Sequence, residues 1–191
     1  HSSLLSFLYC DDDLPRDEES LYIWKSLGIP DERIAFLGKD DNFWIAGETG
    51  PCGPDSEMFY FRSNDEIPEK FDPEDERWVE IWNDVFMQYY KHEDGTVTEL
   101  PKKNVDTGMG LERVVAVLEG VNDNYKSSIW NDVIQEIEEI SGKKYEGNEK
   151  SMRIIADHIR TAVFISADPA GIKPSNTDQG YILRRLIRRA I

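Results

Sequence analysis

Hydrophobic and polar residues follow different periods along the chain. Short apolar or alternating runs, which are typical of strands, occupy residues 4–9, 34–37, 78–90, 96–100 and 105–109. Apolar residues that recur every three or four positions, which are typical of helices, occupy residues 17–27, 111–118, 127–140, 151–166 and 178–191. The pattern therefore predicts an α+β fold, in which an antiparallel sheet with flanking helices is followed by a helical segment.

The strand predicted over residues 78–90 carries an unusual polar position. Alternation places one set of side chains on a single face: Val79, Ile81, Asn83, Val85, Met87 and Tyr89. Asn83 is the only strongly polar member, and a buried amide needs hydrogen-bond partners. Asn83 is therefore either a bridge within the core or a ligand contact. Asp94-Gly95 is typical of a hairpin turn, so residues 96–100 are expected to return antiparallel to this strand.

Residues 42–60 (NFWIAGETGPCGPDSEMFY) are dense in glycine and proline. This composition predicts a rigid loop instead of a regular element. Aromatic residues stand at both of its ends: Phe43, Trp44, Phe59 and Tyr60. The stretch is either the wall of a shaped pocket or a long structural turn.

Residues 105–118 (VDTGMGLERVVAVL) change from a short strand to a helix. Gly108 and Gly110 leave bare backbone, which admits a flat ligand close to the chain. Arg113, one turn into the helix, can reach a phosphate with its planar set of donors. The alternative is an ordinary corner between a strand and a helix with a surface arginine.

Charge is distributed unevenly. The net charge is −16, yet residues 150–191 carry +5 and residues 1–149 carry −21. The helix predicted over residues 178–191 has one apolar stripe and one basic stripe, formed by Arg184, Arg185, Arg188 and Arg189. Arginines without acidic partners favour phosphate contact over a merely solvated face, which suits RNA binding at one end of the chain. Ser175 or Asn176 is expected to cap this helix.

Cysteine and histidine are sparse. Cys10 and Cys52 form no motif, which favours a reduced, cytoplasmic setting. No second histidine or cysteine stands near His158 at metal-ligand spacing, so no zinc or other metal site is predicted. No signal peptide or membrane-crossing run is found, so no membrane partner is expected.

Four stretches together resemble the alanyl-tRNA synthetases, a family of class II aminoacyl-tRNA synthetases. They read NFW with GETGPCGPDSE, WNDVFMQY, DTGMGLER, and RIIADHIRT with PSNTDQGYILRRLIRRA, and the third is similar to motif 3 of class II enzymes. The chain departs from the family at Asp55, where a second cysteine is usual and a thiol pair is thereby impossible, and at Gln179, where arginine is common.

The resemblance implies that residues 1–126 are the C-terminal part of the catalytic domain. Residues 127–191 would begin the helical tRNA-recognition domain. The function implied is ATP-dependent activation of L-alanine and its transfer to tRNA(Ala). Motifs 1 and 2 are not found in the sequence, so the fragment by itself is expected to be inactive.

The resemblance also implies roles for individual residues. Arg113 and Asp106 would be catalytic, with Arg113 on the γ-phosphate of ATP, which brings Mg²⁺ with it. Gly108 and Gly110 would lie beside nucleotide or substrate, and Asp106 and Asn83 would bind the ammonium and carboxylate ends of alanine. Trp44 and Val85 would wall its methyl pocket. In the acceptor stem of tRNA, Asn176 would contact a G·U pair, while the four arginines of the basic stripe hold phosphates.

Two other classes of function remain open from the sequence. The chain could be a non-catalytic tRNA-binding fragment or paralogue, which would bind tRNA without exchanging pyrophosphate. It could also be a structural or protein-interaction domain whose acidic surface meets a basic partner.

Overall fold

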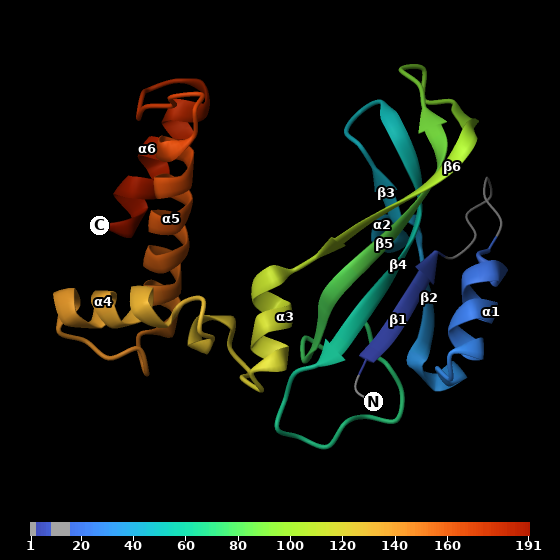
Figure 1. The fold of residues 1–191 in the computed structure, drawn as a ribbon, viewed down its shortest axis with the longest axis horizontal. Coiled ribbons are helices and arrows are strands. Elements are labelled where there is room, and N and C mark those ends of the chain that lie inside the picture. Colours follow the sequence, from blue (N-terminus) through green and yellow to red (C-terminus); the bar gives the residue numbers. More distant parts are fainter. Residues whose placement is uncertain (1–2, 9–15) are drawn as a thin grey trace. The chain divides into compact units, whose positions relative to one another are not determined.

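A computed structural model describes residues 3–8 and 16–191 (Figure 1). The chain divides into two compact units, residues 1–122 and residues 123–191, which are described separately below. Tyr9, the expected end of the first strand, and Cys10 lie outside the described residues.

The first unit is built on one sheet with strand order β2-β1-β4-β5-β6, and β3 pairs with β4 at one end. The strands are β1 (Ser3–Leu8), β2 (Ile34–Leu37), β3 (Phe43–Ile45), β4 (Gly50–Phe61), β5 (Trp78–Lys91) and β6 (Val97–Met109). All pairings are antiparallel except β1–β2, which is parallel because helix α1 (Glu18–Ser26) carries the chain back between them. The predicted α+β fold is confirmed, whereas the parallel edge pair was not predicted.

The remaining helices are α2 (Lys39–Asn42), α3 (Leu111–Leu118), α4 (Asn131–Ser141), α5 (Glu149–Ala167) and α6 (Asp178–Ala190), with 3₁₀ turns at Asp31–Arg33 and Asn124–Lys126. The predicted helix over residues 127–140 begins four residues later than expected. The cause is local: Ser127 is fully buried, and its hydroxyl donates to the Asn124 carbonyl at 2.6 Å, which closes the 3₁₀ turn instead.

The prediction of a loop over residues 42–60 was wrong, because most of this stretch forms β3 and β4. The pairing of β4 with β5 is irregular between Cys52 and Asp55, and this irregularity contains Gly53 and Pro54. Gly53 is needed there, because a Cβ at this position would overlap the Phe86 carbonyl oxygen of β5. Proline and glycine are tolerated inside a strand at such bulges.

The two strands predicted over residues 96–100 and 105–109 are parts of the single strand β6. Their pairing with β5 is interrupted between Met87 and Tyr89, and Pro101 falls in the unpaired part of β6. A proline can stand in an edge strand where no ladder hydrogen bond is required.

The second unit contains α4, α5 and α6, and Figure 1 shows α5 and α6 lying side by side. Its core consists of Trp130, Ile134, Tyr145, Met152 and Ala156. At the edge of this core, the Tyr145 hydroxyl donates to Asp123 Oδ2 at 2.7 Å and accepts from Arg153 Nε at 2.7 Å. Arg153 Nη2 also donates directly to Asp123 Oδ2 at 2.6 Å. This network links the first residue of the unit to α5.

We expect Tyr145→Phe to lower the free energy of unfolding of the second unit by about 1–2 kcal/mol, because two charged partners lose a buried hydrogen bond. Burial raises the pKa of Tyr145 to about 12. A raised pKa means that the native state retains the proton more tightly than the unfolded state does. The contribution of the protonated Tyr145 hydroxyl to the free energy of unfolding is therefore fully present below about pH 10 and is lost between about pH 10 and 12.

Urea denaturation of wild type and Tyr145→Phe at neutral pH and across that pH range will test this expectation. Tyr181→Phe is the matched control, since Tyr181 is 42% exposed. Equal effects of the two substitutions would contradict a stabilising role for the Tyr145 hydroxyl.

Candidate functional site

Strand register brings the predicted amino-acid ligands together on one face of the sheet. Directly paired residues of antiparallel strands project from the same face. Two such rows cross β4, β5 and β6: one contains Asp55, Val85 and Asp106, and the other contains Glu57, Asn83 and Gly108. Four residues named from the sequence thus share one small surface: Asn83, Val85, Asp106 and Gly108.

Asn83 is held by two carboxylates of β4. Its Nδ2 donates to Asp55 Oδ2 at 2.8 Å and to Glu57 Oε1 at 3.3 Å. Asp55 is only 4% exposed, and this burial raises the pKa of its carboxyl group, although hydrogen bonds from Asn83 and Asn42 oppose the rise. The sequence singled out Asp55 as a departure from the family pattern but did not reveal that it contacts Asn83.

Asp106 and Gly108 lie on the outer strand β6 and are exposed. Asp106 Oδ1 accepts a hydrogen bond from the Thr107 backbone at 2.9 Å. A Cβ at Gly108 would meet no atom within 4 Å, so the space over this backbone is open. This open surface is compatible with a ligand that lies close to the chain.

Trp44 stands apart from this set. It lies on β3 opposite Gly53, in register with the bulge of β4 and not with Val85, and it is 38% exposed. Its predicted role as a pocket wall together with Val85 therefore rests on the family resemblance alone.

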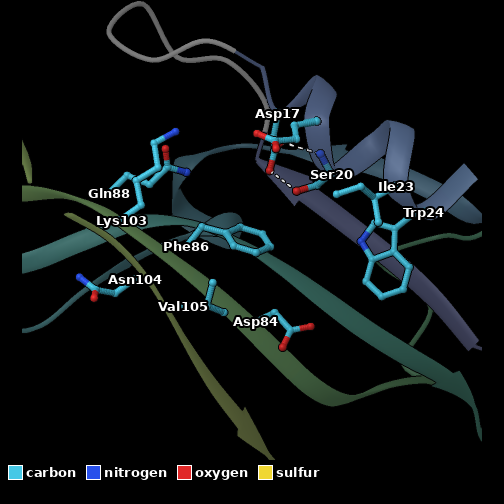
Figure 2. A pocket seen from close by; sticks show the side chains of 11 residues that line it. Asp17, Ser20, Ile23, Trp24, Asp84, Phe86, Gln88, Lys103, Asn104 and Val105 are labelled. Carbon is cyan, nitrogen blue, oxygen red and sulfur yellow. Dashed lines mark hydrogen bonds between the residues drawn. The ribbon is translucent and has the colours of Figure 1, made fainter. Parts of the chain in front are cut away.

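The opposite face of the sheet is partly covered by α1. Side chains that alternate with Asn83 and Val85 line a cavity of about 410 Å³ together with α1, among them Asp84, Phe86 and Gln88. Figure 2 shows Trp24 and Ile23 of α1 turned toward this cavity, with Asp17 bonded to Ser20 at the start of the helix. The surface formed by Asn83, Val85, Asp106 and Gly108 thus lies on the face of the sheet away from α1.

Arg113 lies in the first turn of α3, the helix that follows β6. Its Nη1 donates to the Glu80 carbonyl oxygen at 2.8 Å and to Glu80 Oε2 at 3.0 Å. Its side chain is 44% exposed, and neither Nε nor Nη2 bonds to any other described residue. A Cβ at Gly110 would approach Arg113 Cδ to 2.9 Å, so Gly110 makes room for the arginine stem itself. This finding differs from the prediction that Gly110 leaves room for a ligand.

The second unit presents the basic stripe of α6. Arg185, Arg188 and Arg189 line a groove of about 360 Å³ with His158 of α5. Arg185 also lies over the Tyr181 ring, 5.7 Å from its centroid. None of the four α6 arginines forms an ion pair with a described acidic residue, which leaves their charge available to an external anion.

The capping prediction for α6 was wrong, because Thr177 is the N-cap and makes no side-chain cap bond. Ser175 Oγ instead donates to the Thr177 carbonyl at 2.7 Å and accepts from its backbone N–H at 3.2 Å. Asn176 Oδ1 accepts from Arg184 Nη1 at 2.5 Å, so its amide bridges the loop and the arginine stripe.

The described ranges 3–8 and 16–191 hold neither a cluster of metal-ligating side chains nor a helix that could cross a membrane. No group of three or more histidine, cysteine, aspartate or glutamate side chains there is arranged to hold a metal ion. In the same ranges, no helix has the length and apolar composition needed to cross a bilayer.

Comparison with known proteins identifies the family of the chain. Residues 4–191 match the family model described as tRNA synthetases class II (A). The chain belongs to this class II synthetase family. It is 53% identical over 187 residues to the alanine–tRNA ligase of Treponema denticola, covering 95% of this chain and 31% of that protein.

Two further alanine–tRNA ligases are similarly identical to this class II chain, and again most of this chain but only a small part of the relative is covered. That of Borrelia hermsii is 47% identical over 187 residues, with 95% of this chain and 32% of the relative covered. That of Anaeromyxobacter dehalogenans is 46% identical over 191 residues, with 93% and 21% covered. The chain thus spans less than a third of the length of these curated relatives, and the predicted resemblance is confirmed.

Proposed function

We propose that this chain is a segment of an alanine–tRNA ligase, which activates L-alanine with ATP and transfers it to tRNA(Ala) in the cytoplasm. Residues 1–126 would belong to the catalytic domain, and residues 127–191 would begin the tRNA-recognition domain. The observation that carries the proposal is the register that gathers Asn83, Val85, Asp106 and Gly108 on one sheet face.

The proposed chemistry depends on positioning. Attack of the alanine carboxylate on the α-phosphate of ATP forms alanyl-adenylate and releases pyrophosphate, and it needs aligned, charge-stabilised groups more than a covalent protein intermediate. Asp106 supplies negative charge beside the substrate's ammonium group, and Val85 supplies an apolar contact for its methyl group. The open backbone at Gly108 lets these groups approach closely.

Arg113 supplies the phosphate contact in this proposal. Its free Nε and Nη2 donors suit the γ-phosphate, while Nη1 stays on Glu80 and fixes the direction of the side chain. Magnesium would arrive bound to ATP, and no step requires a metal ion held by this segment alone.

The second unit would hold the acceptor stem. The unpaired charge of Arg184, Arg185, Arg188 and Arg189 suits backbone phosphates, and the Asn176 amide suits a base edge in the shallow minor groove of A-form RNA.

The proposal is tested by alanine-dependent exchange of pyrophosphate into ATP. We expect exchange by the complete ligase that contains this segment and none by the isolated 191 residues, because no motif 2 arginine is found in them. A complete protein that binds tRNA(Ala) but does not exchange pyrophosphate would instead support the non-catalytic alternative.

Arg113→Ala in the complete ligase is expected to weaken ATP binding by about 1.5–3 kcal/mol, the value of a hydrogen bond to a charged group. Calorimetric titration with ATP measures this change. Lys126→Ala is the matched control, because Lys126 also forms a surface ion pair and is similarly exposed, at 49% against 44% for Arg113. Equal ATP affinity in wild type and Arg113→Ala would leave Arg113 with only its contact to Glu80.

A further inference from the structure

The carboxylates of β4 determine how the Asn83 amide is turned. Asp55 Oδ2 and Glu57 Oε1 both contact Asn83 Nδ2. An ionised carboxylate only accepts hydrogen bonds, so the amide must present its NH₂ group to this pair and its oxygen elsewhere. The amide orientation is therefore dictated by chemistry and is not an arbitrary choice between two similar atoms.

The amide oxygen of Asn83 is left without a protein donor. Asn83 Oδ1 is buried, and no described residue donates a hydrogen bond to it. Buried acceptors are nearly always satisfied, so an atom of this kind at a binding surface points to a donor on the ligand. Asp106 and Gly108 of β6 are the neighbours of Asn83 and Val85 across the sheet, so the same surface carries a second acceptor and open space.

We propose that Asp55 is a positioning residue, which holds the Asn83 amide so that Oδ1 accepts a hydrogen bond from the ammonium group of the amino-acid substrate. This inference rests on the proposed function. It assigns Asn83 to the ammonium end of alanine, whereas the family resemblance had suggested the carboxylate end. A substrate carboxylate has no donor to offer Oδ1, and the donors of the amide are already engaged by Asp55 and Glu57.

The residue type at position 55 matters for this task. The cysteine that is usual in the family has a weakly accepting sulfur, so it would restrain the amide less strongly than a carboxylate does. Burial raises the pKa of Asp55, which is the expected consequence of keeping a carboxyl group away from water, while the hydrogen bond from Asn83 opposes this rise.

The test uses pyrophosphate exchange by the complete ligase, with alanine and ATP varied separately. We expect Asp55→Leu to raise the KM for alanine roughly tenfold with an unchanged KM for ATP, because the amide can then rotate. Asp55→Asn, whose own amide oxygen can accept from Asn83, should restore the KM for alanine to within about twofold of wild type. Alaninol, which has the ammonium group but no carboxylate, should lose inhibitory strength in Asp55→Leu in parallel with alanine.

Ser56→Ala is the matched control. Ser56 is the fully buried neighbour of Asp55 and pairs with Asp84 in the register, so it belongs to the opposite face and should not affect the KM for alanine. If Asp55→Leu does not fold, Asp55→Cys is judged by the same criterion of a selectively raised KM for alanine.

Several results would overturn the inference. An unchanged KM for alanine in folded Asp55→Leu, or in Asp55→Cys where it replaces Asp55→Leu, would do so. Equal rises in the KM for alanine and for ATP in that variant would do so as well. Unchanged inhibition by alaninol together with a raised KM for alanine would assign the contact to the carboxylate instead. A wild-type ligase without alanine-dependent exchange would refute the proposed function as well, and so these failures are distinguishable.

Discussion

Gly53→Ala is expected to lower the free energy of unfolding of the sheet unit by about 3 kcal/mol or more, at the upper end of the range for overpacked sites. A Cβ at this position would overlap the carbonyl oxygen of Phe86 and crowd its carbonyl carbon. Both atoms belong to the backbone of β5, so no side-chain rotation can relieve the overlap. The bulge between Cys52 and Asp55 would have to open, and the strand pairing beside the Asp55–Asn83 contact would shift.

Urea denaturation followed by tryptophan fluorescence measures this effect. Gly38→Ala is the matched control, because an added Cβ at Gly38 meets no atom within 4 Å and its backbone is extended. The control should change the free energy of unfolding by less than about 0.5 kcal/mol. If Gly53→Ala were as stable as this control, the close approach of β4 to β5 would be refuted.

The second large effect concerns RNA. In the complete ligase, Asn176→Asp is expected to reduce aminoacylation of tRNA carrying the G·U pair by about 10- to 100-fold, the usual size of a lost base contact. The substitution removes the amide donor and adds negative charge beside the RNA. The structure also predicts little change in thermal stability, since Thr177 and not Asn176 is the N-cap and an aspartate can still accept from Arg184.

Arg188→Ala is the comparison for this experiment. Arg188 lies in the groove of α6 and is expected to contact phosphate, so its loss should weaken binding to all tRNAs alike and reduce the salt dependence. Charging assays with G·U and G·C acceptor stems, combined with thermal unfolding, separate the two roles. Normal charging by Asn176→Asp would contradict base recognition and leave Asn176 as a structural partner of Arg184.

Much of the fold follows from signals that are local in the sequence. The periodicity of residues 111–118 and 151–166 predicted α3 and α5 to within two residues, because helical hydrogen bonds join residues only four positions apart. The Asp94-Gly95 turn predicted the β5–β6 hairpin for the same reason. The family motifs also named the candidate ligand residues, because the identity of a side chain limits the chemistry it can perform.

Strand pairing depends on residues far apart in the sequence, and here the local signals were misleading. Glycine and proline in residues 42–60 predicted a loop, although the bulge of β4 accommodates them through a contact with Phe86 of β5. The prediction that Ser175 or Asn176 caps α6 was wrong for a similar reason. The Ser175 hydroxyl donates to the Thr177 carbonyl, and the Asn176 amide oxygen accepts from Arg184, which lies eight residues further along the chain.

The sequence by itself determined the α+β class, the approximate positions of α1, α3, α4, α5 and α6, the acidic body with a basic end, and the residues that carry the class II resemblance. The tertiary structure alone decided the parallel β1–β2 pair, the register that sets Asn83 beside Asp106 and Gly108, and the contact of Asp55 with Asn83. The physical reason is that the hydrogen bonds between paired strands are made by backbone groups, which are nearly the same for every residue type. Register is therefore chosen by packing and burial summed over whole strands, and a change of one residue would place Asn83 and Val85 on the other face.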